Sequence, residues 1–116
     1  MNRWERKAPD FYLMQNDTSP SVAFQLIDGT GTPISLVGAS VKFFMYAPGA
    51  ASAKVNAAAT ITDSGLGKVS YTPTASNTDT PGDYLAQFQV TFASSAVETF
   101  PNGDHLKIRV MTDLAA

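Results

Sequence analysis

The residue types that do acid-base or nucleophilic chemistry are scarce in this chain of 116 residues. A Ser-His-Asp or Cys-His catalytic group needs a histidine base, and His105 is the only histidine. The absence of cysteine excludes a thiol nucleophile, a disulfide and a thiolate metal site. We interpret His105 as a polar residue at the end of a strand, because it follows a turn and precedes an alternating segment. We therefore assign no catalytic residue and expect the chain not to be an enzyme.

Carboxylates suggest two other kinds of chemistry. Glycoside hydrolysis needs two acidic side chains in one cleft, but the only glutamates are Glu5, in an N-terminal arm, and Glu98, on an expected strand. Calcium binding by loop oxygens is the other. The aspartates in expected turns are Asp28, Asp63, Asp79, Asp83 and Asp104. No EF-hand spacing joins them, and Asp beside Gly is typical of turns. We therefore favour turns and expect no cofactor, with calcium dependence left open.

Composition and charge narrow the classes of partner. The net charge of -2 and a pI near 5.1 argue against a nucleic-acid binder, which would be strongly basic. No apolar run approaches the roughly 20 residues that span a bilayer, so we expect no membrane contact. No signal peptide is visible, and we expect folding in a host cytoplasm. Only 16% of the residues are charged, which is typical of a surface that meets other proteins.

The elements that must position these side chains are short strands between turns. Segment 40–46 carries apolar residues on both faces and is expected to be central, and 54–62 and 68–72 are expected to form a hairpin. The loop after 74 is expected to include a single helical turn. A short segment at 34–36 follows the second expected strand and its turn. The expected strands are 11–15, 22–27, 40–46, 54–62, 68–72, 84–92, 97–100 and 106–110.

Residues 79–92 contain the most informative pattern in the chain. A turn built on Asp79, Pro81 and Gly82 leads into a strand in which Tyr84 and every second residue after it share an aromatic-rich face. An acidic residue, a Gly and a Tyr at a strand entry are typical of the tyrosine corner of immunoglobulin-like sandwiches, in which the Tyr hydroxyl bonds to upstream backbone. We therefore predict an all-β, immunoglobulin-like antiparallel β-sandwich of about seven to nine strands, spanning residues 11–112, with a C-terminal tail at 113–116.

Residues 1–10 form an N-terminal arm that the sandwich does not need. The arm carries Trp4, the only tryptophan, flanked by Arg3, Arg6 and Lys7. Termini of this kind are usually disordered, which is the interpretation we favour. The alternative is a docking element that orders against a partner through these four residues.

The order and spacing of several motifs resemble a known group of proteins. These motifs are residues 16–20 ahead of the strand at 24–26, then 31–41, 67–71, 82–84 and 98–101. Together they span roughly residues 10–110 and resemble small immunoglobulin-like proteins of tailed phages and prophages, in particular the N-terminal domain of the upper baseplate protein of siphophages.

The resemblance implies a structural connector without catalysis that attaches to a phage tail. A baseplate connector would continue into further domains, so a free-standing copy ending at Ala116 is expected to be a virion part at tail, neck or capsid, or an accessory of assembly. The expected partners are other phage structural proteins, with self-association left open, and the expected location is the virion. The alternative function is a carbohydrate- or cell-surface-binding module, which an exposed aromatic would serve.

Overall fold

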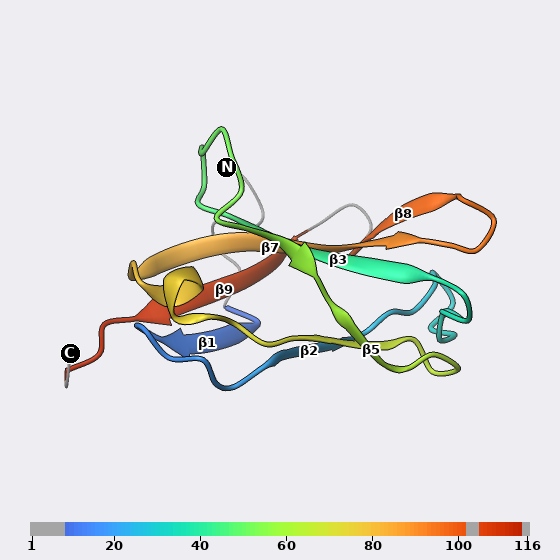
Figure 1. Cartoon of the computed structure of the whole chain (residues 1–116), viewed down its shortest axis with the longest axis horizontal. Helices are drawn as coiled ribbons and strands as arrows, with labels where there is room; N and C mark the ends of the chain where they lie inside the picture. The colour runs from blue at the N-terminus through green and yellow to red at the C-terminus, as the bar shows by residue number, and fades with distance from the viewer. Residues whose placement is uncertain (1–8, 102–104, 115–116) are drawn as a thin grey trace.

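The computed structural model describes residues 9–101 and 105–114 and folds them into two β-sheets packed face to face (Figure 1). The larger sheet contains β1 (Phe11–Met14), β3 (Ser40–Tyr46), β4 (Val55–Ala58), β7 (Gly82–Thr91), β8 (Val97–Phe100) and β9 (Leu106–Met111). The smaller sheet contains β2 (Val22–Gln25), β5 (Thr60–Asp63) and β6 (Lys68–Tyr71). A short 3-10 helix, η1 (Ala75–Thr78), is the predicted helical turn. The described residues thus confirm the predicted all-β sandwich, with nine strands.

The larger sheet has the order β1-β9-β7-β3-β4, and the smaller sheet has the order β2-β6-β5. β3 lies between β7 and β4, as its two apolar faces predicted. One pairing differs from the expected antiparallel arrangement, because β1 runs parallel to β9. The two strands lie at opposite ends of the chain, and such a pairing places no hairpin signal in the sequence. The sandwich is therefore antiparallel except at this edge.

β8 and β9 both pair with β7, one after the other. Phe100 at the end of β8 lies opposite Phe88, and Leu106 at the start of β9 lies opposite Ala86. Five residues of the sequence separate Phe100 from Leu106, whereas only Gln87 separates their partners Phe88 and Ala86. The antiparallel ladder along this edge of β7 is formed first by β8, is interrupted at Gln87 and is continued by β9.

The predicted strand at 54–62 is wrong as a single element. β4 pairs with β3 in the larger sheet, whereas β5 pairs with β6 in the smaller one, so the chain changes sheets at Ala59. The amide of Ala59 still bonds to the carbonyl of Val41 at 2.9 Å. Only β5 forms the predicted hairpin with β6. The short segment at 34–36 forms no strand, and an isolated bridge joins Ile27 to Pro33 just before it.

The core lies between the two sheets and is rich in aromatic rings. Phe43 and Phe88, which are 1% and 0% exposed, pack with ring centroids 5.1 Å apart. Tyr71 from the smaller sheet stacks on Phe43 at 4.7 Å, and Phe24 stacks on Phe88 at 6.1 Å. Offset and tilted rings at these distances are favourable beyond the area that they bury. These four rings join the two sheets.

Both predicted domain boundaries lie close to hydrogen bonds of the sheet. The amide of Asp10 bonds to the carbonyl of Lys107 at 2.7 Å, and the Asp10 carboxylate accepts the amide of Lys107 at 2.7 Å. At the other end, the amide of Asp113 reaches the side chain of Gln15 at 3.4 Å. Asp10 and Asp113 therefore attach to the sandwich, although the predicted boundaries placed them in the arm and the tail.

Candidate functional site

Tyr84 forms the hydrogen bond that defines a tyrosine corner. Its ring is buried, with 4% exposed, and its hydroxyl donates to the carbonyl of Thr80, four residues upstream, at 2.6 Å. Gly82, at the start of β7, has a φ of 148°. The bond ties the entry of β7 to the turn before it. This corner therefore fixes the path of the chain into β7.

Asp79 attaches the same turn to the rest of the fold. Its carboxylate accepts hydrogen bonds from the Lys54 ammonium at 2.5 Å and from the Thr80 hydroxyl at 2.9 Å, while its carbonyl accepts one from Gln15 at 3.2 Å. The Lys54 hydrogen bond is the main cause that lowers the pKa of Asp79. Asp79 therefore anchors the turn to the segment before β4.

Thr78 is a buried polar residue that the sequence analysis did not single out. The residue is fully buried, and its hydroxyl donates to the carbonyl of Asp17 at 2.9 Å. The amide of Asn16 bonds in return to the carbonyl of Thr78 at 2.9 Å. A threonine in a polar loop gives no sequence signal for such a contact, because its partner lies 61 residues away.

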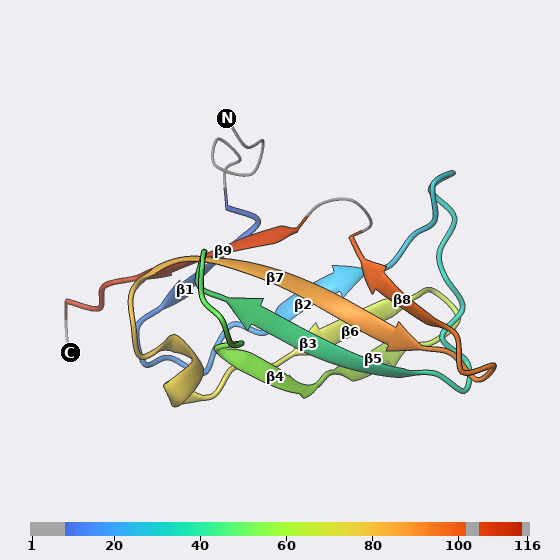
Figure 2. The same cartoon turned by 90° about the horizontal axis from the view of Figure 1, so that it is seen from above.

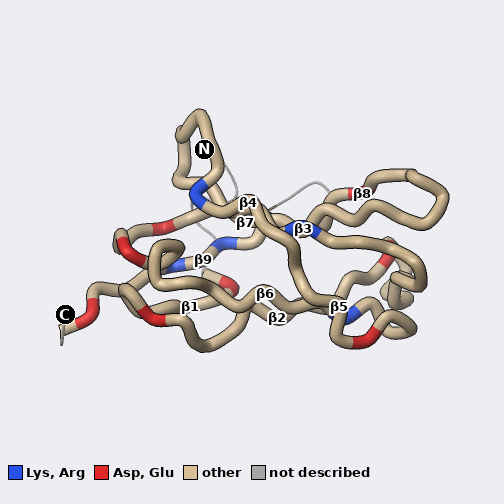
Figure 3. The backbone as a smooth tube through the Cα atoms, in the orientation of Figure 1, with Lys and Arg blue, Asp and Glu red and all other residues tan. Residues whose placement is uncertain are grey.

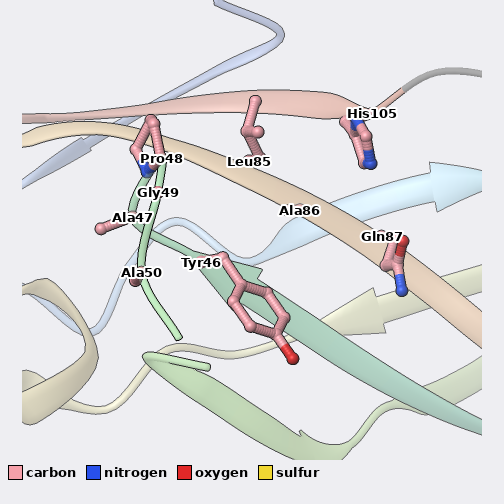
Figure 4. A pocket seen from close by; sticks show the side chains of 9 residues that line it. All are labelled: Tyr46, Ala47, Pro48, Gly49, Ala50, Leu85, Ala86, Gln87 and His105. Carbon is pink, nitrogen blue, oxygen red and sulfur yellow. The ribbon is translucent and has the colours of Figure 1, made fainter. Parts of the chain in front are cut away.

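His105 lies in a pocket of about 380 Å³ on the outer face of the larger sheet (Figure 4). The ring of Tyr46 and the side chain of Gln87 line the pocket beside it, and the loop after β3 forms another wall. The lining residues are Tyr46, Ala47, Pro48, Gly49, Ala50, Leu85, Ala86, Gln87 and His105. No Asp, Glu, Ser or Thr is among them, and the Tyr46 phenol is their only hydroxyl. The geometry thus offers a hydrogen-bonding, partly aromatic hollow and not a Ser-His-Asp arrangement.

The loop carboxylates bond to their own turns. The Asp28 carboxylate accepts hydrogen bonds from the amides of Thr30 and Thr32, at 2.8 and 3.0 Å, and from the Thr30 hydroxyl at 2.6 Å. The hydrogen bond from the Thr30 hydroxyl is the main cause that lowers the pKa of Asp28. Asp63 accepts the amide of Leu66 at 3.1 Å. Asp104 lies outside the described residues. Within the described residues, no group of three His, Asp or Glu side chains is placed to hold a metal ion.

Charged residues lie on the adjacent strands β7 and β9 (Figure 3). Arg109 donates to both oxygens of Asp83, at 2.7 and 3.3 Å, and the Lys107 ammonium lies 3.8 Å from the same carboxylate. The hydrogen bond from Arg109 is the main cause that lowers the pKa of Asp83. Asp83 therefore belongs to a cross-strand ion cluster, whereas its sequence neighbours suggested a turn.

The remaining predicted docking residues, Trp4, Arg3, Arg6 and Lys7, lie outside the described residues. Within residues 9–101 and 105–114, no helix is long and apolar enough to cross a membrane.

The described residues form a β-sandwich with a tyrosine corner and a pocket of about 380 Å³ beside His105. No protein-family model matches the chain, and no curated protein matches it. Among solved structures, it is similar to the N-terminal domain of phage TP901-1 ORF48, with a TM-score of 0.62 and 12% identity. That match covers 93% of this chain and 91% of the phage domain. A second structure, CopC from Methylosinus trichosporium OB3b, is 14% identical with a TM-score of 0.49, over 93% of this chain and 88% of that one. At these identities the phage match establishes a shared fold.

Proposed function

We propose that the chain is a non-enzymatic structural component of a tailed phage or prophage virion, acting through protein contacts at the tail, baseplate or another part of the particle. The observation that carries this proposal is the match to a phage domain over nine-tenths of both chains. A match of that extent includes the whole sandwich and not a local motif. The ordered sequence motifs that resemble siphophage baseplate domains support the same class of protein.

Exposed apolar side chains on two adjacent strands support this proposal. Several large apolar side chains are exposed along β1 and β9, including Tyr12 at 55%, Met14 at 39% and Met111 at 41%. Tyr12 pairs with Arg109 and Met14 with Met111, so the three apolar side chains lie on two adjacent strands. Apolar side chains that adjoin one another on a surface are typical of protein interfaces. Other virion proteins, or copies of this chain, are the proposed partners.

Mass spectrometry of purified particles tests the virion role. A tagged copy is expressed in the host during phage production, and particles are purified on a density gradient. We expect the chain to copurify with the particles at a fixed ratio to a known tail or head protein, and a non-virion phage protein with the same tag serves as the control. Absence of the chain from intact particles would refute the structural role.

One observation favours a second function, a carbohydrate-binding module. The pocket next to His105 combines the Tyr46 ring with the hydrogen-bonding side chain of Gln87, which is the combination that sugar sites use (Figure 4). A glycan array with the intact chain and a Tyr46→Ala variant distinguishes the two functions. Saturable binding that the substitution abolishes, in a variant that melts like the parent, would favour the carbohydrate-binding module.

A further inference from the structure

The outer face of the larger sheet carries two aromatic rings on its central strand. β4, β3 and β7 lie side by side on this face, which Figure 2 views from above. Along β3, Phe43 and Met45 are buried in the core. Because successive side chains of a strand point to opposite faces, Lys42, Phe44 and Tyr46 lie on the outer face. Lys42 is exposed, and the two rings are half-buried.

Phe44 lies between two amide side chains. It is paired with Asn56 of β4 on one side and with Gln87 of β7 on the other. Side chains that are paired in this way share a face and lie about 5 Å apart. Asn56 is exposed and Gln87 is half-buried, so both amides border the ring on the solvent side. The apolar face of a sugar ring can stack on such an aromatic ring while its hydroxyls bond to the amides.

The pocket next to His105 continues this surface. Tyr46 lines the pocket and is two residues from Phe44, about 7 Å along the same strand. Gln87 lines the pocket as well and also flanks Phe44, so the two positions share this amide. The loop after β3, which rises from the same face in Figure 1, forms the end wall. The surface therefore offers adjacent positions for two sugar rings and suits an oligosaccharide.

Charge selects the class of oligosaccharide. Lys42 precedes the two rings on β3, and its neighbours in register, Ala58 and Gln89, are uncharged. Within residues 9–101 and 105–114, the only carboxylate in a strand on this face is Asp83, which Arg109 binds at 2.7 and 3.3 Å. An anionic group of a ligand can therefore meet Lys42 without breaking that ion pair.

We propose that the outer face of β4, β3 and β7 binds an acidic oligosaccharide, a glycan whose sugar rings carry carboxylates. One sugar ring lies on Phe44, with hydroxyls bonded to Asn56 and Gln87. The next lies in the pocket on Tyr46, and Lys42 binds a carboxylate of the glycan. This inference rests on the carbohydrate-binding module, the second function, and names its class of ligand. The virion role does not depend on it.

Isothermal titration calorimetry with three oligomers of similar length tests the ligand class. Oligogalacturonate carries a carboxylate on every ring, its methyl ester is the same glycan without the charge, and polyglutamate carries the charge without the sugar. We expect the intact chain to bind oligogalacturonate, to bind the ester about two- to fivefold more weakly, as loss of one exposed ion pair predicts, and not to bind polyglutamate. Equal affinity for acid and ester, binding of polyglutamate, or no binding of any oligomer would overturn the proposal.

Substitution of Lys42 tests the contact with the carboxylate. Lys42→Gln should lower the affinity for oligogalacturonate to that for the ester and should leave the affinity for the ester unchanged, because only the ion pair is lost. Lys68→Gln is the matched control, since Lys68 is an exposed strand residue of the smaller sheet. It should change neither affinity. Equal effects of the two substitutions would refute the role of Lys42.

Substitution of Phe44 tests the stacking position. Phe44→Ala should weaken the binding of acid and ester alike by about tenfold, because the sugar ring loses its apolar contact. A melting curve verifies that the variant folds, and Phe44→Leu, which keeps an apolar side chain without the ring, replaces it if it does not. A folded variant that binds like the parent would refute this position.

The outcomes separate this inference from the two proposed functions. Equal binding of acid and ester that Tyr46→Ala abolishes would retain a carbohydrate-binding module and overturn its preference for acidic glycans. A chain that copurifies with particles but binds no glycan would overturn this inference and leave the virion role intact.

Discussion

Replacement of Tyr84 by Phe isolates the energy of the tyrosine corner. The substitution removes the hydroxyl that donates to Thr80 at 2.6 Å and leaves the buried ring in place. A net hydrogen bond contributes about 1 kcal/mol, and the cost would exceed this if the carbonyl of Thr80 were left dry. Thr80 is exposed, so water can replace the lost donor. We therefore expect a loss of about 1 kcal/mol in the free energy of unfolding and about 4 °C in Tm.

Urea denaturation followed by circular dichroism measures this loss. The matched control is Tyr12→Phe, because Tyr12 is 55% exposed and lies on a strand of the same sheet. A hydroxyl removed from such a site should change stability by less than about 0.5 kcal/mol. If the two variants had equal midpoints and slopes, the Tyr84 hydroxyl would contribute nothing, and the argument that the corner holds β7 to its turn would fail.

Three further substitutions test other parts of the fold. The pKa of Asp83 is lowered, mainly by the hydrogen bond from Arg109. The Asp83 carboxylate therefore stabilises the fold above the ordinary carboxyl pKa, and this contribution is lost as pH falls below about 4. Asp83→Asn should show a smaller loss of urea midpoint between pH 7 and pH 3 than the parent. Thr78→Val keeps the buried shape but removes a hydrogen bond and should cost about 1 kcal/mol by the same denaturation assay. Gly67→Ala should lower Tm more than Gly31→Ala, because both glycines have positive φ but only at position 67 would the new Cβ meet backbone oxygens, at 2.6 and 2.7 Å; equal losses would contradict this steric reason.

Local patterns predicted the strands better than they predicted the strand partners. Segment 40–46 has the predicted bounds, because apolar residues alternate along it and small or turn-forming residues flank it. The parallel pairing of β1 with β9 was missed because a period-two pattern defines a face but no neighbour. The change of sheet at Ala59 was missed because the alternation continues through it, and a strand that switches sheets has the same local composition as one that does not.

In the candidate sites, too, contacts between residues close in sequence were predictable and contacts between distant segments were not. The Tyr84 hydrogen bond was predictable because donor and acceptor are four residues apart, in a turn with a recognisable composition. The pocket next to His105 was not predictable, because the break in the ladder opposite Gln87 brings together a loop, a strand and a strand end from distant parts of the chain. A groove lined by Phe24 and Phe100 likewise depends on which strand lies at the edge of each sheet.

The change of sheet at Ala59 connects the two sheets covalently along one side of the sandwich. Ala58 belongs to the larger sheet and Thr60 to the smaller one, and two peptide steps span at most about 7 Å. The sheets cannot separate further along this side without unpairing β4 or β5. Within residues 9–101 and 105–114, no single residue joins two strands of different sheets on the side of β2 and β8. This covalent limit on the separation of the sheets therefore acts on the Ala59 side alone.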